Sequence, residues 1–341
     1  MAEAQHRLKQ AKINLIALAV TYADNYGPSG AGPGHFPCPN ANLPDGQRKN
    51  EGPSPPCGGK PFYIGRLPRL AGISRTGKVL NYQANRYDAD HALWYVISGG
   101  FVNNPFSLET RVNPSAKGVL SLDTSDELVA MIIDPGLPLD QQRKLRPGVD
   151  PAGYIESGIR DGKFLRASGE QTNDIYLPIS SDELMPLVLT RVLGSVRQWL
   201  LDYRDQRCAG ATTTPCFPEA AASDDGVCQP GNHDGWLAVR AGDCVDSLFT
   251  GLQFESVQRE LHWFIKNQWW KFIRYKVATE CQGEAAMTCN VQAGQVDVDG
   301  VVYPGIEIRP ETQSMETGSI GFFGSKPCSC LVVQGKLFPA A

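Results

Sequence analysis

Ten cysteines dominate the chemistry that this sequence could support, because a thiol can bind a metal, act as a nucleophile or form a disulfide. Their spacing is not that of a zinc site, since they form no CxxC pair and no closely spaced histidine accompanies them. Their even number and their position in loops rich in glycine and proline favour disulfides, which form in oxidising compartments. We expect five disulfides and a protein located outside the cytoplasm.

The cysteines fall into three expected local pairs and a remainder. Cys38 and Cys57 would close one loop rich in cysteine and proline, and Cys216 and Cys228 would close a similar loop later in the chain. Cys281 and Cys289 flank a short turn and form the third expected pair. The pairing of the other four stays open: Cys208, Cys244, Cys328 and Cys330. The last two are separated by one residue, which would strain a mutual bond, so we expect them to join the C-terminal tail to the rest of the second unit. The functional alternative for Cys328 and Cys330 is a redox or metal pair.

An aromatic and basic segment, WFIKNQWWKFIRYKVA, is the main candidate for ligand binding. One interpretation is that its alternate residues form the core of a sheet. The other is that exposed Trp263, Trp269 and Trp270 beside Lys271 grip a glycan, a surface or single-stranded DNA. Adjacent residues of a strand point to opposite faces, so one of the two neighbouring tryptophans is expected to be exposed.

Calcium is the one ion that the sequence suggests, and no other cofactor is expected. Asp297 and Asp299 precede a glycine in Asp-Val-Asp-Gly, and calcium binds several oxygens presented by a tight turn. Asp-Gly is also a common turn dipeptide, and the twelve-residue EF-hand pattern is not matched.

Enzymatic motifs are missing from the sequence. It contains no GxSxG, HExxH, GxGxxG or complete P-loop, and its five histidines have no partner at ligand spacing. A net charge of −4 gives no electrostatic footprint for nucleic acid. We therefore expect a protein that is not an enzyme.

Two amphipathic helices are predicted to position these groups. In residues 6–26, apolar side chains recur every three or four positions, and Gly27-Pro28 ends the pattern. A second helix is expected to begin after Ser180, which forms a capping box with Glu183. Thr124 and Glu127 show the same pattern, which predicts a short helical turn before Val129.

Strands are predicted at short β-branched or aromatic segments bounded by turn residues: 93–98, 129–134, 175–179, 272–278, 301–303, 306–309 and 331–334. The glycine and proline content favours short antiparallel strands over long helices. A helix and a sheet that each have one apolar face bury each other. The predicted fold class is therefore α+β.

The same order of elements occurs twice. Tyr22, Cys38, Tyr95 and Pro135 in the first half correspond to Tyr203, Cys216, Tyr275 and Pro310 in the second, at offsets of 175–181 residues. We expect two tandem units, 1–176 and a cysteine-rich 177–341, each with a long N-terminal amphipathic helix on a small antiparallel sheet and with disulfide-closed loops.

The first unit carries a series of loop motifs in a fixed order. They are HFPCPN at 35–40, Asp45-Gly46, Cys57-Gly58, GRLP at 65–68, WYV at 94–96 and IIDPG at 132–136. This order resembles type IV pilins and type II secretion pseudopilins, and in particular minor pilin-like proteins. The second unit keeps the layout but lacks GRLP. The apolar start of that family, about 20 residues long, is also absent, and we expect that an N-terminal half-helix is missing.

The resemblance implies a structural subunit, the soluble head of a minor pilin or pseudopilin at or near the tip of a type IV pilus or type II secretion pseudopilus. Its partners would be other pilin or pseudopilin subunits, with the inner membrane reached only through the missing segment. It would lie in the periplasm, anchored to the inner membrane when full length, or in a filament on the cell surface. The alternative is an adhesin or secreted disulfide-rich binding module for a glycan, a surface or DNA.

Overall fold

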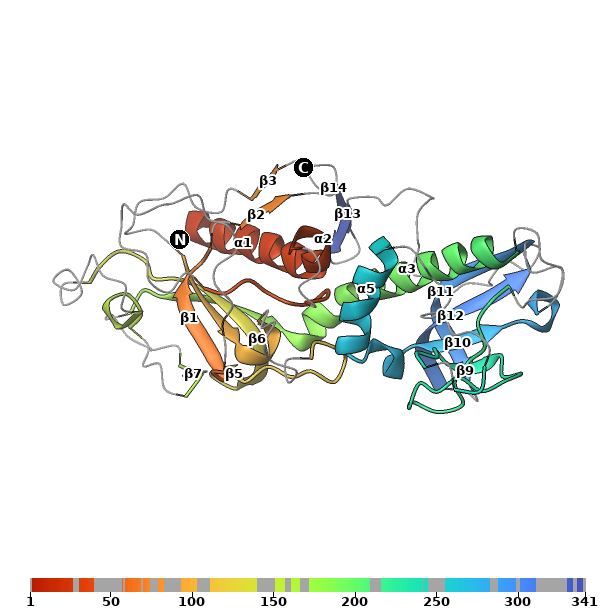
Figure 1. Ribbon diagram of the computed structural model, residues 1–341. Coiled ribbons are helices and arrows are strands. Elements are labelled where there is room, and N and C mark those ends of the chain that lie inside the picture. The colour runs from red at the N-terminus through yellow and green to blue at the C-terminus, as the bar shows by residue number, and fades with distance from the viewer. Residues whose placement is uncertain are drawn as a thin grey trace. The chain divides into compact units, whose positions relative to one another are not determined.

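The chain forms a mixed α+β structure rich in antiparallel sheet, which confirms the predicted class (Figure 1). The computed structural model describes residues 2–26, 31–39, 57, 59–68, 70–73, 79–82, 93–102, 111–139, 151–156, 161–165, 172–208, 216–240, 242–244, 255–282, 288–298, 301–310, 330–333 and 336–339. Two compact units emerge: Met1–Val192 with Gln258–Trp269, and Leu193–Val257 with Trp270–Ala341. The boundary between residues 176 and 177, which is predicted from the repeated order of elements in the sequence, stays a prediction.

The first unit begins with α1 (Ala2–Val20), which is followed after Thr21 by α2 (Tyr22–Tyr26). The predicted apolar stripe is buried along this stretch, at Leu8, Ala11, Leu15, Leu18 and Tyr22. Polar bonds at the margin of the stripe join α1 to the sheet of this unit. The guanidinium of Arg7 lies 2.6 Å from the Asp134 carboxylate, and Lys12 donates to the Pro178 carbonyl at 2.7 Å.

The main sheet of the first unit has six strands in the order β1-β4-β6-β5-β7, with β8 also paired to β6. They are β1 (Phe62–Arg66), β4 (Trp94–Ser98), β5 (Leu120–Leu122), β6 (Ser125–Asp134), β7 (Lys163–Phe164) and β8 (Ile175–Ser180). Only β5 and β7 pair in parallel. A separate antiparallel pair consists of β2 (Leu70–Ile73) and β3 (Val79–Tyr82), and 3-10 turns lie at Gly99–Phe101 and Pro151–Gly153.

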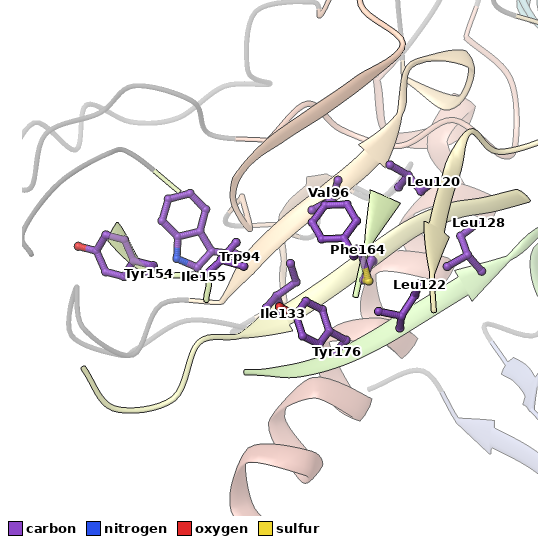
Figure 2. Packing of buried hydrophobic residues seen from close by; sticks show 11 residues of the cluster. Trp94, Val96, Leu120, Leu122, Leu128, Ile133, Tyr154, Ile155, Phe164 and Tyr176 are labelled. Carbon is purple, nitrogen blue, oxygen red and sulfur yellow. The ribbon is translucent and has the colours of Figure 1, made fainter. Parts of the chain in front are cut away.

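Both faces of this sheet are covered, so that β4 is buried along its whole length. On one face Trp94 packs on Tyr154 within a cluster that also contains Phe164 and Tyr176 (Figure 2). Successive strand residues point to opposite faces, so Tyr95 lies on the other face. Burial there, and to a smaller extent the charge of Tyr22, raises the pKa of Tyr95 well above its usual range.

The second long helix, α3 (Ser181–Cys208), begins at the predicted cap. The Glu183 backbone N–H donates to the Ser180 hydroxyl at 3.2 Å, which satisfies one of the free donors at the helix start. Pro186 lies in the second turn of the helix without displacing its start. The predicted stripe of this helix is largely buried, at Val192, Val196, Leu200 and Tyr203.

The second unit contains a four-stranded sheet in the order β11-β12-β10-β9. These strands are β9 (Asp234–Trp236), β10 (Arg274–Val277), β11 (Cys289–Val298) and β12 (Val301–Pro310), and β13 (Cys330–Val333) pairs separately with β14 (Lys336–Pro339). β10 runs parallel to β12, whereas the other pairs of the four-stranded sheet are antiparallel.

One face of the second sheet is apolar and buried, at Tyr275, Val277, Val291, Ile306 and Ile308. Burial first, and then electrostatic interaction with Tyr203 of α3, raises the pKa of Tyr275 well above its usual range. Two arginines of α3 also reach edge strand β11. Arg197 donates to the Val291 carbonyl at 2.8 Å, and Arg204 donates to the Cys289 carbonyl at 3.1 Å.

Two sequence predictions about local structure are wrong. The turn predicted from Thr124 and Glu127 is not helical, because these residues lie at the tight β5–β6 connection, where Asp123 and Glu127 have positive φ. Part of the aromatic segment predicted as a strand is helical instead. α5 (Glu255–Lys266) and a 3-10 turn at Trp269–Phe272 precede β10, and a further 3-10 turn lies at Thr279–Cys281.

The other predicted strands are found, with changed bounds, and the two predicted at 301–303 and 306–309 form the single strand β12. Among the residues described, no helix is both long and apolar enough to cross a membrane.

Candidate functional site

Four disulfides are formed among the described residues. Cys38–Cys57 and Cys281–Cys289 are the predicted pairs, with Cα atoms 5.9 and 6.1 Å apart. The predicted Cys216–Cys228 pair is wrong, because Cys216 pairs with Cys208 and Cys228 pairs with Cys244. Cys330 is the first residue of β13, and Cys328 lies outside the described residues. A cluster of Glu219 with Cys228 and Cys244 has metal-like spacing, but its sulfurs are already bonded to each other.

The exposed tryptophan site suggested by the sequence is not formed. Trp263, Trp269 and Trp270 are buried, with exposed fractions of 3, 0 and 6%, whereas Lys271 is partly exposed. The expectation that one of the adjacent tryptophans faces solvent is wrong because both lie in a 3-10 turn, where strand alternation does not apply. These rings are core residues.

The calcium prediction is only partly covered by the described residues. Asp297 is exposed near the end of β11, and Asp299 lies outside the described residues. The calcium site therefore stays a prediction.

A buried histidine lies in the first unit, in the loop that carries Cys38. The His35 ring nitrogen Nδ1 lies 2.9 Å from the Gly32 carbonyl, and the ring is 6.3 Å from that of Tyr22. Burial is the main cause that lowers the pKa of His35 to about 4, and the charge of Lys266 lowers it further. A neutral ring with one nitrogen engaged by the backbone is a packing residue.

Two carboxyl groups meet at the end of β8. Glu156 and Asp174 exchange backbone bonds, since each backbone N–H donates to the carboxylate of the other at 2.8 and 3.2 Å. Tyr176 also donates to Asp174 Oδ2 at 2.6 Å. Burial, followed by the side-chain hydrogen bond to Glu156, raises the pKa of Asp174 to about 7. Asp174 therefore titrates near neutral pH, and the two backbone bonds tie the 151–156 loop to the start of β8.

The polar face of the second sheet is the strongest candidate for a binding site. Residues in register across neighbouring strands share one face, so the pairing defines two rows. The first row runs from Trp236 through Arg274 and Gly305 to Gly294. The second runs beside it from Asp234 through Lys276 and Glu307 to Gln292. We call these eight residues, with Tyr303 and Arg309 of β12, the polar face.

Arg274 organises the aromatic part of the polar face. Its guanidinium carbon lies 4.8 Å from the ring centre of Trp236 and 5.9 Å from that of Tyr303, which is cation–π distance. The two rings meet edge to face, with centres 6.0 Å apart and planes inclined by 78°. Both rings are partly exposed, unlike the tryptophans that the sequence suggested.

The charges of the polar face are mutually paired. Asp234 lies 3.4 Å from Arg274 and 3.3 Å from Lys276, and Glu307 lies 2.7 Å from Arg309. Two buried polar atoms lack a hydrogen-bond partner, Arg274 Nε and Gln292 Oε1. A buried polar atom without a partner is costly.

Three comparisons with known proteins give no match: no family model, no curated protein and no solved structure resembles the chain.

Sequence reasoning missed most of this face. Arg274 and Lys276 stand out as basic residues near the aromatic segment, but Trp236 and Tyr303 lie far from them in the chain. The available signal was the alternation of polar and apolar residues in Arg274–Val277, which marks a strand with one solvent face. Strand register, which the sequence does not specify, brings the other members together.

Proposed function

We propose that the protein is a non-enzymatic structural subunit, the head of a minor pilin or pseudopilin built from two related helix-and-sheet units. One observation carries the proposal: each unit buries a helix tyrosine and a strand tyrosine at matching positions, Tyr22 with Tyr95 and Tyr203 with Tyr275. In each pair burial, and to a smaller extent the charge of the helix tyrosine, raises the pKa of the strand tyrosine. The paired positions are 181 and 180 residues apart, as a duplicated unit would retain.

The two copies have diverged in their sheets. β4, which carries Tyr95, is antiparallel to β6, whereas β10, which carries Tyr275, is parallel to β12. We therefore infer that the helix and the strand that carries the second tyrosine, β4 in the first unit and β10 in the second, derive from one ancestral unit. The first unit would keep the pilin-like role, and the second would be free to acquire another.

The disulfides support a location outside the cytoplasm, because structural disulfides persist where thiols are not kept reduced. In the proposed filament the partners are other pilin or pseudopilin subunits. A head with two units is bulky, which favours a place at or near the tip over one in the filament wall.

Deleting the gene in its source cell tests this function. We expect fewer surface filaments, or less type II secretion, with an unchanged amount of the major subunit, because a tip subunit initiates assembly. Expression of the wild-type protein should restore the count. Unchanged filament number and unchanged secretion in the deletion strain would refute the assignment.

A further inference from the structure

We propose that the polar face of the second sheet binds a neutral oligosaccharide, with Trp236 and Tyr303 as the stacking platform and the row Asp234–Lys276–Glu307–Gln292 as the hydrogen-bonding edge. This inference goes beyond the filament role and does not depend on it. It rests on four features of the face: its aromatic rings, its glycine floor, its paired charges and its unpartnered polar atoms.

The aromatic rings provide apolar area at an otherwise polar surface. Trp236 and Tyr303 are partly exposed and are held by Arg274, which lies within cation–π distance of both. Rings fixed in this way lose little conformational entropy when a ligand packs on them. A pyranose ring has an apolar C–H surface of matching character, flanked by hydroxyl groups.

The floor of the site is bare backbone at Gly294, whereas the buried Val296 covers the Gly305 position, where an added Cβ atom would meet Val296 Cγ2 at 2.6 Å. Gly294 and Gly305 lie opposite each other on β11 and β12, in the same row as Trp236 and Arg274. A Cβ atom built on Gly294 meets nothing within 4 Å, so there is open space above this position. Glycine in a strand interior weakens the strand, and it often marks a site where a ligand approaches the backbone.

The polar edge offers donors and acceptors in alternation. Along the row stand a carboxylate, an ammonium, a second carboxylate and an amide: Asp234, Lys276, Glu307 and Gln292. A sugar hydroxyl both donates and accepts, so it can bridge neighbours of opposite type. Gln292 Oε1 and Arg274 Nε are buried and unpartnered, and a ligand hydroxyl would satisfy either atom.

The same charges argue against a nucleic-acid strand. Single strands bind where unpaired cations follow the phosphates and aromatic rings stack the bases. Here Arg274 and Lys276 share the Asp234 carboxylate and Arg309 contacts Glu307, so the three cations all contact a carboxylate and the face carries only one excess positive charge. The net charge of −4 also opposes approach of a polyanion. Paired charges suit a neutral polyhydroxyl ligand.

Calorimetric titration of the full chain with neutral oligosaccharides tests the proposal. The probes are cellohexaose, chitohexaose, maltohexaose and xylohexaose, with a twelve-residue oligothymidylate as the competing ligand. Tyr303→Ala removes one ring of the platform. Gly294→Val fills the open space above the floor with a residue that suits a strand and removes no packed side chain. Gln295→Val, on the opposite face of the same strand, is the matched control.

We expect at least one hexasaccharide to bind and its affinity to fall at least tenfold in Tyr303→Ala and Gly294→Val, with an unchanged affinity in Gln295→Val. Thermal unfolding of each variant verifies folding, and Gly294→Val keeps the test decisive if Tyr303→Ala unfolds. Three results would overturn the proposal: no binding of any hexasaccharide, wild-type affinity in Gly294→Val, or binding of oligothymidylate alone. None of them bears on filament number, so the two proposals fail separately.

Discussion

Replacing Asp174 with asparagine should stabilise the protein at alkaline pH and have little effect at acidic pH. In the wild type, burial and the neighbouring Glu156 carboxyl make the charged form of Asp174 unfavourable. Asparagine imitates the protonated acid, since its side-chain oxygen can still accept from the Glu156 N–H and from the Tyr176 hydroxyl. Its amide N–H can donate to the Glu156 carboxylate.

The magnitude follows from the pKa. Folding raises the Asp174 pKa from 3.8 to about 7, so the folded state binds the proton more tightly than the unfolded state. This carboxyl therefore has no cost below pH 3.8, costs stability progressively as pH rises toward 7, and has a constant cost above that. At about 1.4 kcal/mol for each pKa unit the full cost is roughly 4 kcal/mol. Because Asp174 keeps some solvent contact, we expect a gain of about 2–4 kcal/mol in the variant at pH 8.

Urea unfolding of wild type and Asp174→Asn measures the effect at pH 4, 6 and 8, which lie on both sides of the Asp174 pKa of about 7. Asp126→Asn, at an exposed aspartate of β6, is the matched control and should behave as the wild type at every pH. A variant that is no more stable than wild type at pH 8, or a difference that does not grow with pH, would show that folding does not raise the pKa of Asp174.

Three further predictions concern single side chains and the disulfides. His35, with a pKa lowered to about 4, should have a neutral ring at pH 5.5 in two-dimensional nitrogen NMR, and a charged ring there would contradict its burial. Because its folded pKa lies below its usual value of 6.5, its contribution to stability is lost as pH falls from 6.5 toward 4. Asn267→Ala should destabilise by about 1–3 kcal/mol in urea unfolding, because Asn267 Oδ1 accepts from the buried Val112 N–H at 2.9 Å; an unchanged midpoint would rule out that role. Peptide mapping without reduction should recover Cys208–Cys216 and Cys228–Cys244 as linked peptides, whereas a Cys216–Cys228 peptide would contradict the loop geometry.

Helix starts illustrate what local pattern can and cannot predict. The Ser180 and Glu183 pattern predicts the start of α3 because a cap is satisfied within one turn of chain. The same pattern at Thr124 and Glu127 fails. There β5 and β6 pair across a tight turn, and Glu127 forms an ion pair with Lys117 at 2.6 Å. The pairing of β6 with β5, β4 and β8 overrides a local capping preference of about 1 kcal/mol.

The aromatic segment has a uniform composition but forms three different kinds of secondary structure. The run of large side chains from Trp263 to Tyr275 suggests strand alternation, and a strand is predicted at 272–278. The segment instead joins the end of α5, a 3-10 turn and β10, and each part buries its aromatic residues in its own way. Both interpretations of the segment assumed strand alternation; the core interpretation is right about burial, because large aromatic side chains favour it, and the exposed one is wrong.

Disulfide pairing and the polar face share one reason for being hard to predict. The partner of Cys228 is Cys244, and the neighbour of Arg274 is Trp236, yet neither choice follows from spacing. Pairing depends on which Cα atoms come within about 6 Å, and a shared sheet face depends on strand register. The Cys38–Cys57 and Cys281–Cys289 bridges could be found from the sequence because no other cysteine lies between or close to their partners, whereas Cys208, Cys216, Cys228 and Cys244 follow one another and allow several local pairings.

Gold labelling of intact filaments tests the proposed subunit role most directly. An antibody against residues 216–240 of the second unit would be applied to source cells and to sheared filaments, with the deletion strain as control. Because a head with two units is bulky, we expect gold particles at filament ends. Label along the shafts would contradict the tip position, and absence of label from all filaments would contradict the filament role itself.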